Sequence, residues 1–300
     1  MAFNRIIKSF LLFSFFFFQY AFAQPADTDI WLYQVLKTEK GIEFKNGFNM
    51  TNHQGYDNQP FFTPDNKFLL FTSTREGKQS DIFRYHFKSG KISRVTATAV
   101  SEYSPMIKPD GKNISVVMVE RDSSQRIWHF NAMIKSDETS CSENEQQLLI
   151  PELDSVGYYS WLNKDTIVYY KLTQPHSLHV YALSSKKDVL LGYEPTRSFR
   201  PCGFRKFFYV LKKENNNELR VYDWSIRKSE VLALADKANE DFIWDKDYGF
   251  MKSEGGKIFT LNATTKDWME WGNFTPNGIN KITRFAVSPD GKWLAVVSNQ

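Results

Sequence analysis

Short apolar runs, joined in pairs by a polar turn, recur along the chain. The clearest pairs occupy residues 59–73, 104–119 and 286–297, and their turns read Pro-Asp-Asn or Pro-Asp-Gly followed by lysine. Proline presets φ for a turn, aspartate hydrogen-bonds to its own backbone, and glycine or asparagine tolerates the left-handed conformation. Each pair therefore predicts a β-hairpin. Weaker copies follow at residues 161–170, 204–210 and 244–253.

A third apolar run follows each hairpin except the last, and a fourth run closes the unit. The third runs are residues 82–85, 127–130, 178–181, 219–222 and 258–261. Residues 189–191 and 231–234 are examples of the fourth run. Four short antiparallel strands within roughly 40–50 residues are typical of a β-propeller blade.

The strands that the last hairpin lacks are found at the other end of the chain. Residues 29–33 match residues 81–85 of the first blade, and residues 47–51 supply a fourth strand. We expect this N-terminal pair to complete the blade that the C-terminal hairpin begins, because a closed ring leaves no free inner edge. The sequence predicts an all-β fold, a single six-bladed β-propeller of four-stranded antiparallel blades over residues 24–300.

Residues 1–23 stand apart from this pattern. Arg5 and Lys8 give a positive start, residues 9–20 are apolar, and Ala21-Phe22-Ala23 places small residues where a signal peptidase needs them. This order predicts a secretory signal peptide cleaved before Gln24. The alternative is a membrane anchor, but about 20 apolar residues are needed to span a bilayer and this run is shorter.

Removal of the leader changes the charge balance of the chain. The full sequence has a formal net charge of +4, and 36 basic and 34 acidic side chains remain after residue 23. This near-neutral balance argues against a nucleic-acid partner, which would favour a basic face. No cysteine lies directly after the apolar run, which excludes the lipid attachment of a bacterial lipoprotein, and no later segment is apolar and long enough to span a membrane. We expect a periplasmic or secreted protein.

The chain has two cysteines, Cys141 and Cys202. An exported protein can form a disulfide between them. Cys141 lies in a polar, turn-like stretch and Cys202 follows a proline, and nothing in the pattern brings the two together. Whether they pair stays open at this point.

The repeat resembles the TolB-type, WD-like propeller repeat. The resemblance rests on Pro-Asp-Gly-Lys after a short strand, then residues 73–77 and Asp81-Ile82-Phe83, and it is faint in the middle three blades. It implies a fold rather than a function, since related blades occur in peptidase propellers and oligogalacturonate lyases. TolB has an α/β domain before its propeller, and only about half a dozen residues separate Gln24 from the first strand here. TolB's role in the Tol–Pal system therefore does not follow from the repeat.

Familiar catalytic motifs are absent from the sequence. It contains no Gly-x-Ser-x-Gly, no phosphate-binding Gly-x-x-x-x-Gly-Lys, no Gly-x-Gly-x-x-Gly, no His-Glu-x-x-His and no Cys-x-x-Cys. These absences disfavour serine hydrolase, nucleotide, redox and zinc-peptidase chemistry. We expect no cofactor and favour a protein that is not an enzyme.

Three weaker constellations have plain alternatives. His176 and His179 have a spacing that could hold a metal, but a strand histidine and a loop histidine explain them better. Asp245-Lys246-Asp247 resembles half of a calcium loop, but it falls where other blades have their hairpin turn. A basic group opens the fourth blade, and a solvated rim is its simpler explanation. That group is Arg197, Arg200, Arg205 and Lys206.

The segments that enter the first strand of each blade are the better guide to a site. In a propeller these segments ring one mouth of the central channel, and rigid blades hold them in place. Each carries an aromatic ring, which beside hydrogen-bonding groups suits a sugar face, a peptide side chain or a protein knob. The alternative is that the rings only pack between blades. The candidates are Tyr56, Asp57, Asn58, Glu102, Tyr103, Tyr158, Arg197, Arg200, Asp241 and Arg284.

Two functions are compatible with this reading. The first is an exported, non-enzymatic propeller that binds an envelope protein or peptide at the channel mouth. The second is a polysaccharide-binding or oligogalacturonate-lyase-like propeller, to which His176, His179 and carboxylates such as Asp57 and Asp241 would contribute.

Overall fold

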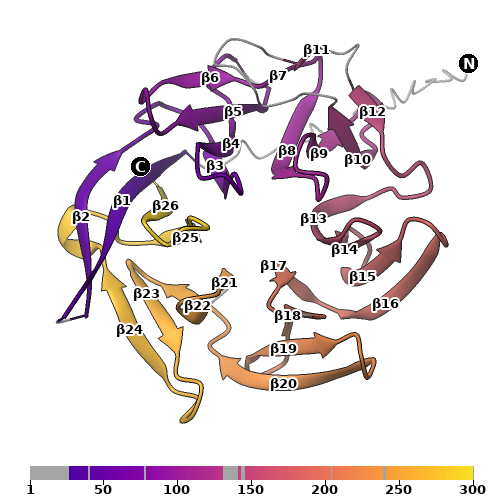
Figure 1. Cartoon of the computed structure of the whole chain (residues 1–300). Helices are drawn as coiled ribbons and strands as arrows, with labels where there is room; N and C mark the ends of the chain where they lie inside the picture. The colour runs from indigo at the N-terminus through magenta and orange to yellow at the C-terminus, as the bar shows by residue number, and fades with distance from the viewer. Residues whose placement is uncertain are drawn as a thin grey trace, which may run out of the picture.

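A computed structural model describes residues 27–39, 41–77, 79–130, 141–142, 146–203, 205–238 and 241–299. The predicted signal peptide at residues 1–23 lies outside these residues. Six four-stranded antiparallel sheets are arranged as blades around a central axis (Figure 1). The six-bladed all-β propeller predicted from the sequence is confirmed.

The blades follow one another along the chain, each running from an inner strand to an outer one. The first is β3 (Asp57–Phe62), β4 (Phe68–Ser73), β5 (Asp81–His86) and β6 (Ile92–Arg94). The second is β8 (Ser101–Ile107), β9 (Ile114–Val119), β10 (Gln125–Phe130) and β12 (Gln146–Leu148). The third is β13 (Val156–Asn163), β14 (Thr166–Lys171), β15 (Ser177–Ala182) and β16 (Lys187–Tyr193).

The remaining blades complete the ring. The fourth is β17 (Pro195–Pro201), β18 (Lys206–Lys212), β19 (Asn217–Asp223) and β20 (Lys228–Ala235). The fifth is β21 (Phe242–Asp245), β22 (Gly249–Glu254), β23 (Lys257–Leu261) and β24 (Trp268–Asn273). The sixth is β25 (Ile282–Val287), β26 (Trp293–Asn299), β1 (Thr28–Thr38) and β2 (Gly41–Asn49). A short parallel pair, β7 (Thr96–Ala97) with β11 (Cys141–Ser142), lies outside the blades.

The two ends of the described chain meet in the sixth blade, as predicted. Strand β1 pairs antiparallel with β26, so that Leu32 lies opposite Ala295. The outer strand differs from the expected residues 47–51, since β2 begins at Gly41. The reason is that β1 has 11 residues and pairs with β2 as far as Thr38, opposite Gly41.

The hairpin turns are closed by their aspartates. The Asp110 carboxylate accepts hydrogen bonds from the backbone N–H of Lys112 at 2.8 Å and of Asn113 at 3.0 Å. Gly111 follows at φ 70°, a left-handed conformation that favours glycine. Asp245 makes the same kind of turn in the fifth blade, with the N–H groups of Asp247 and Tyr248. The stretch that resembles a calcium loop is therefore a hairpin turn.

The second strand of the first blade is mostly apolar because both of its faces are covered by a neighbouring blade. All six residues of β4 are buried. Leu69 and Phe71 pack against the sixth blade at Leu32, whereas Leu70 packs against Val116 of the second blade. Alternate residues of a strand point to opposite faces, so one strand contributes to two cores.

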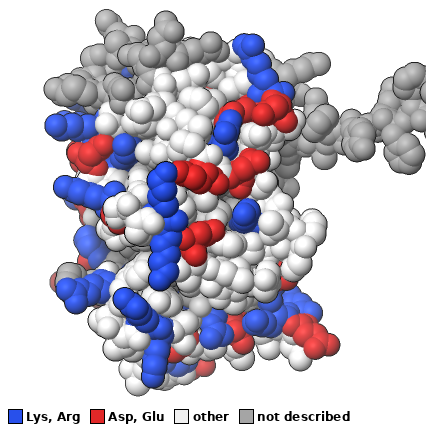
Figure 2. All heavy atoms as spheres, turned by 90° about the vertical axis from the view of Figure 1, so that its right-hand side faces the viewer, with Lys and Arg blue, Asp and Glu red and all other residues white. Residues whose placement is uncertain are grey.

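The lateral surface carries charges of both signs. Figure 2 shows one such face, on which basic and acidic side chains are interspersed. No helix among the described residues is long and apolar enough to cross a membrane.

Candidate functional site

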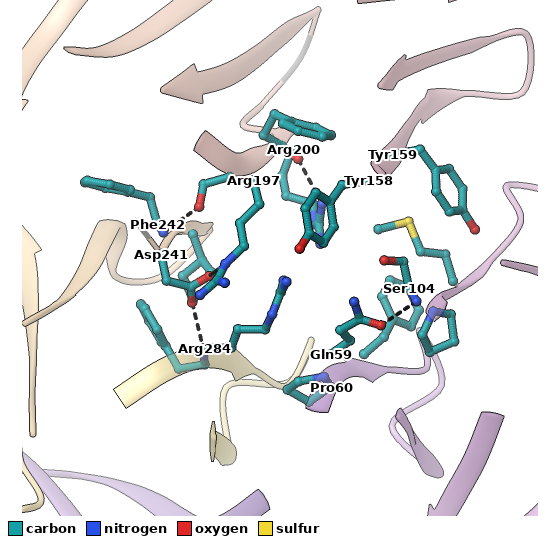
Figure 3. A pocket seen from close by; sticks show the side chains of 17 residues that line it. Gln59, Pro60, Ser104, Tyr158, Tyr159, Arg197, Arg200, Asp241, Phe242 and Arg284 are labelled. Atoms are coloured by element: carbon teal, nitrogen blue, oxygen red, sulfur yellow. Dashed lines mark hydrogen bonds and ion pairs between the residues drawn. The ribbon is translucent and has the colours of Figure 1, made fainter. Parts of the chain in front are cut away.

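The inner strands of all six blades meet at a cavity in the central channel (Figure 3). Strands β3, β8, β13, β17, β21 and β25 supply its lining, together with Asp241 just before β21. The cavity has a volume of about 60 Å³. It is therefore far smaller than the roughly 300–1,000 Å³ typical of pockets for drug-sized ligands.

Three side chains in or directly before the inner strands accept hydrogen bonds from the backbone of the next blade. Gln59 Oε1 accepts the N–H of Ser104 at 2.6 Å, Ser198 Oγ accepts that of Phe242 at 2.8 Å, and Asp241 Oδ2 accepts that of Phe285 at 2.9 Å. We call Gln59, Ser198 and Asp241 the inter-blade acceptors. Because buried N–H groups need partners, these bonds fix the relative positions of neighbouring inner strands.

Irregular backbone in the inner strands sets which side chains face the channel. Gln59 and Ser104 have φ of 58° and 54°, and each sits at a break in the pairing register with the second strand. Such a bulge changes the direction of the side chains beside it. Gln59 can therefore accept hydrogen bonds both from Thr72 of its own blade, at 2.8 Å, and from Ser104.

Three arginines extend into the cavity. Arg197 donates a hydrogen bond to the carbonyl of Thr283 in the sixth blade, and its Nε lies 3.7 Å from Asp241 Oδ1. Arg284 lies over the ring of Tyr158, 5.1 Å from its centre. Arg200 donates to the carbonyl of Phe199 at 2.9 Å. Figure 3 shows Arg197, Arg284 and Tyr158 pointing toward the centre of the cavity.

The cavity is electrostatically positive, since three guanidinium groups face one carboxylate. Burial, and then the charge of Arg284, lower the pKa of Arg200 to about 10. Burial raises the pKa of Asp241, and Arg197 and Arg284 oppose this rise. Burial raises the pKa of Tyr56 to about 12, so its phenol is neutral near pH 7.

Comparison with known proteins identifies the repeat. Residues 41–185 match the family model described as TolB beta propeller domain. The repeat in this part of the propeller is of the TolB type. A curated relative of this TolB-type propeller, an uncharacterized protein of Agrobacterium fabrum, is 26% identical over 84 residues. That match spans 28% of the chain and 27% of the relative, about a quarter of its length.

Solved structures share the fold at low sequence identity. A protein assigned as TolB from Agrobacterium tumefaciens gives a TM-score of 0.59 at 12% identity, over 92% of this chain and 99% of that one. TolB from Acinetobacter baumannii gives 0.54 at 12% identity, over 92% of this chain and 65% of that one. An oligogalacturonate lyase in complex with manganese gives a TM-score of 0.52 at 12% identity, over 85% of this chain and 80% of that one. These likenesses concern the fold alone.

The TolB-type propeller brings seven of the ten candidate residues together. Tyr158, Arg197, Arg200, Asp241 and Arg284 line the cavity. Tyr56 interacts electrostatically with Arg284, Arg197 and Tyr158. The ring of Tyr103 lies 6.5 Å from that of Tyr56.

The other three candidates are held within the blades and do not line the cavity. Asp57 accepts two hydrogen bonds from Arg75, at 3.1 and 3.2 Å. Asn58 accepts the N–H of Gln59 at 2.8 Å. Glu102 has no exposed surface and accepts hydrogen bonds from Thr96 and Thr98. We assign these side chains to packing of the propeller.

The basic group of the fourth blade divides into two parts. Arg197 and Arg200 are half-buried in the channel, whereas Arg205 and Lys206 are exposed near the turn between β17 and β18. Lys206 lies 3.4 Å from Asp223. A solvated rim therefore describes only the second part of the group.

His176 and His179 do not face the same space. His176 packs against the ring of Tyr170 and His179 against that of Tyr169, which are consecutive residues of β14 and point to opposite faces. His179 also contacts Asp188 and Ser177. Among the described residues, no group of three or more His, Cys, Asp or Glu is placed to hold a metal ion.

Cys202 is a buried free thiol. Burial raises the pKa of this thiol to about 12, so it is uncharged and unreactive near pH 7. The side chain of Cys141 lies outside the described residues.

Gln59 and Ser104 are two of the cavity residues that the sequence did not single out. Both belong to the segments that enter the inner strands, but neither is charged or aromatic. Each of the two stands immediately before a proline near the start of a largely apolar strand, and this pattern could have marked them as cavity residues.

Proposed function

We propose that this TolB-type propeller is a non-enzymatic binding module of the cell envelope that holds a protein or peptide at the mouth of its central channel. The observation that carries the proposal is the convergence of Tyr158, Arg197 and Arg284, from three blades, on one cavity. Tyrosine and arginine are enriched among residues that dominate binding energy at interfaces. Rigid blades keep these side chains in place before a partner arrives, which lowers the entropy lost on binding.

Export belongs to the same proposal. The leader at residues 1–23 would direct the chain out of the cytoplasm and be removed before Gln24, leaving a periplasmic or secreted protein. Mass spectrometry of the protein from the periplasm and from the medium tests this step. We expect a mature N-terminus at Gln24, and an intact Met1 in either fraction would contradict it.

Capture of a partner from an envelope extract tests the binding role. The experiment compares the wild-type protein with Arg284→Gln and with Arg121→Gln, which removes the same charge from an exposed loop. We expect one partner to be enriched by the wild type and by Arg121→Gln, and to be lost from Arg284→Gln.

Two outcomes would overturn the proposed function. One is that the wild type retains no partner. The other is cleavage of a uronide polymer together with bound metal in the purified protein, which would favour the polysaccharide alternative.

A further inference from the structure

The channel cavity has more cationic hydrogen-bond donors than acceptors. A guanidinium carries five N–H donors. Arg197 and Arg200 each donate one hydrogen bond to a backbone carbonyl, and Arg284 lies against a tyrosine ring. Among the described residues, no atom accepts a hydrogen bond from the buried Nε of Arg197. The cavity therefore has unused capacity to bind an anion.

Repulsion between the arginines also indicates that the cavity can bind an anion. Burying like charges is unfavourable unless they are paired, and Asp241 alone cannot neutralise three arginines. After burial, the charge of Arg284 lowers the pKa of Arg200, as expected for two guanidinium groups that repel each other, whereas, despite burial, Tyr158, Tyr56 and Asp241 hold the pKa of Arg284 itself above its ordinary value. A second negative group in the cavity would relieve this repulsion.

The size of the cavity limits what that group can be. Its volume of about 60 Å³ is less than half that of a cavity of about 150 Å³ that is known to hold benzene, so a sugar ring does not fit inside it. A carboxylate has three heavy atoms, whereas a phosphoryl group has five. The carboxylate is also planar and matches the fork of a guanidinium.

We infer that this cavity is a carboxylate-binding site formed by Arg197, Arg200 and Arg284. The inference deepens the proposed function and rests on it for the source of the carboxylate, an acidic side chain or free C-terminus of the partner. A small free carboxylate has the same chemistry and is the other source.

Thermal unfolding with simple probes tests the site, at an ionic strength held constant with chloride. The probes are acetate, its uncharged analogue acetamide, and inorganic phosphate. We expect acetate to raise the Tm of the wild type and of Arg121→Gln in a concentration-dependent way, because it binds only the folded state. We expect acetamide to have no effect, and Arg284→Gln to weaken acetate binding at least tenfold.

Three acetylated peptides distinguish the two sources of the carboxylate. They are acetyl-Gly-Asp-Gly-amide, its neutral Asn counterpart, and acetyl-triglycine with a free carboxylate. Binding of the Asp peptide or of acetyl-triglycine, but not of the Asn peptide, would assign the carboxylate to a peptide. Binding of acetate without either acidic peptide would assign it to a small free molecule and overturn the peptide source.

Other outcomes would overturn the site itself. These are equal shifts with acetate and acetamide, a larger shift with phosphate than with acetate, or no shift with any carboxylate. The wild-type comparison of acetate with acetamide remains decisive if Arg284→Gln does not fold. A partner that the wild type and Arg284→Gln capture equally, with no acetate effect, would refute the carboxylate site but not partner binding. An acetate effect without any captured partner would refute partner binding but not the carboxylate site.

Discussion

Glu102 was a candidate binding residue in the sequence, and the structure places it in the packed interior of the propeller. Its carboxyl group has no exposed surface, and burial raises its pKa from 4.5 to about 8 despite hydrogen bonds from Thr98 and Thr96. Asp81 raises the pKa further, whereas Arg94 lowers it. Glu102 is therefore protonated in the folded protein at neutral pH.

This shift predicts a pH dependence of stability. Between pH 4.5 and about 8 the folded chain keeps a proton at Glu102 that the unfolded chain releases. The free energy of unfolding should therefore fall as the pH rises through this window. Glu102→Gln mimics the protonated form and should remove this part of the slope. Urea unfolding at several pH values measures it, and equal slopes for the two proteins would refute the assignment.

The sequence predicted which residue types gather at the channel better than it predicted which of their side chains point into it. The sequence indicated that rings and charges gather where the chain enters each blade, and Tyr158, Arg197 and Arg284 do so. It could not separate them from Glu102, because direction depends on bulges and on partners distant in sequence. The partner of Asp57, for example, is Arg75.

At the scale of elements, the inter-blade acceptors connect neighbouring inner strands. Gln59 is 9% exposed and its Oε1 accepts two hydrogen bonds. Loss of this oxygen would remove the acceptor of the Ser104 N–H and of the Thr72 hydroxyl. A buried polar group without a partner lowers the free energy of unfolding by about 1–3 kcal/mol.

We therefore expect Gln59→Ala to lower the free energy of unfolding by about 1–3 kcal/mol. Gln54→Ala is the matched control, since Gln54 is exposed in the loop before β3, and we expect it to change stability by less than about 0.5 kcal/mol. Denaturant unfolding measures both variants. Equal stabilities would show that the side chain of Gln59 does not hold the first two blades together.

The hairpins were predictable because their turns are local. Proline, aspartate and glycine or asparagine determine each turn within a few residues, and the three clearest repeats all form hairpins between an inner and a second strand. The bulges of the inner strands and the β7–β11 pair were not predicted. Both involve contacts between segments that are far apart in the sequence, such as Gln59 with Ser104 and Cys141 with Thr96.

At the scale of the whole molecule, the ring depends on one seam between β26 and β1. Leu32 lies in this seam with no exposed surface, whereas Leu36, on the same strand, is 39% exposed. The closure of the ring was predictable because the last hairpin supplies only two strands of a blade, and the two strands that complete it are at the N-terminal end of the sequence.

A charge in the seam should destabilise all six blades. We expect Leu32→Asp to lower the free energy of unfolding by more than about 3 kcal/mol, because it buries an unpaired carboxylate. Leu36→Asp, the same change at an exposed position, should cost less than about 1 kcal/mol. Circular dichroism on heating tests this. A Leu32→Asp protein as stable as the Leu36→Asp protein would contradict the role of the seam.

The central claim is that the partner docks at the channel mouth, and site-specific photo-crosslinking in intact cells tests it most directly. A photoreactive phenylalanine analogue replaces Tyr103, beside the channel, or Tyr193, which is 53% exposed on the outer strand β16. We predict a crosslinked partner from position 103 and none from position 193. A partner crosslinked from 193 and not from 103 would place binding on the lateral surface and contradict the claim.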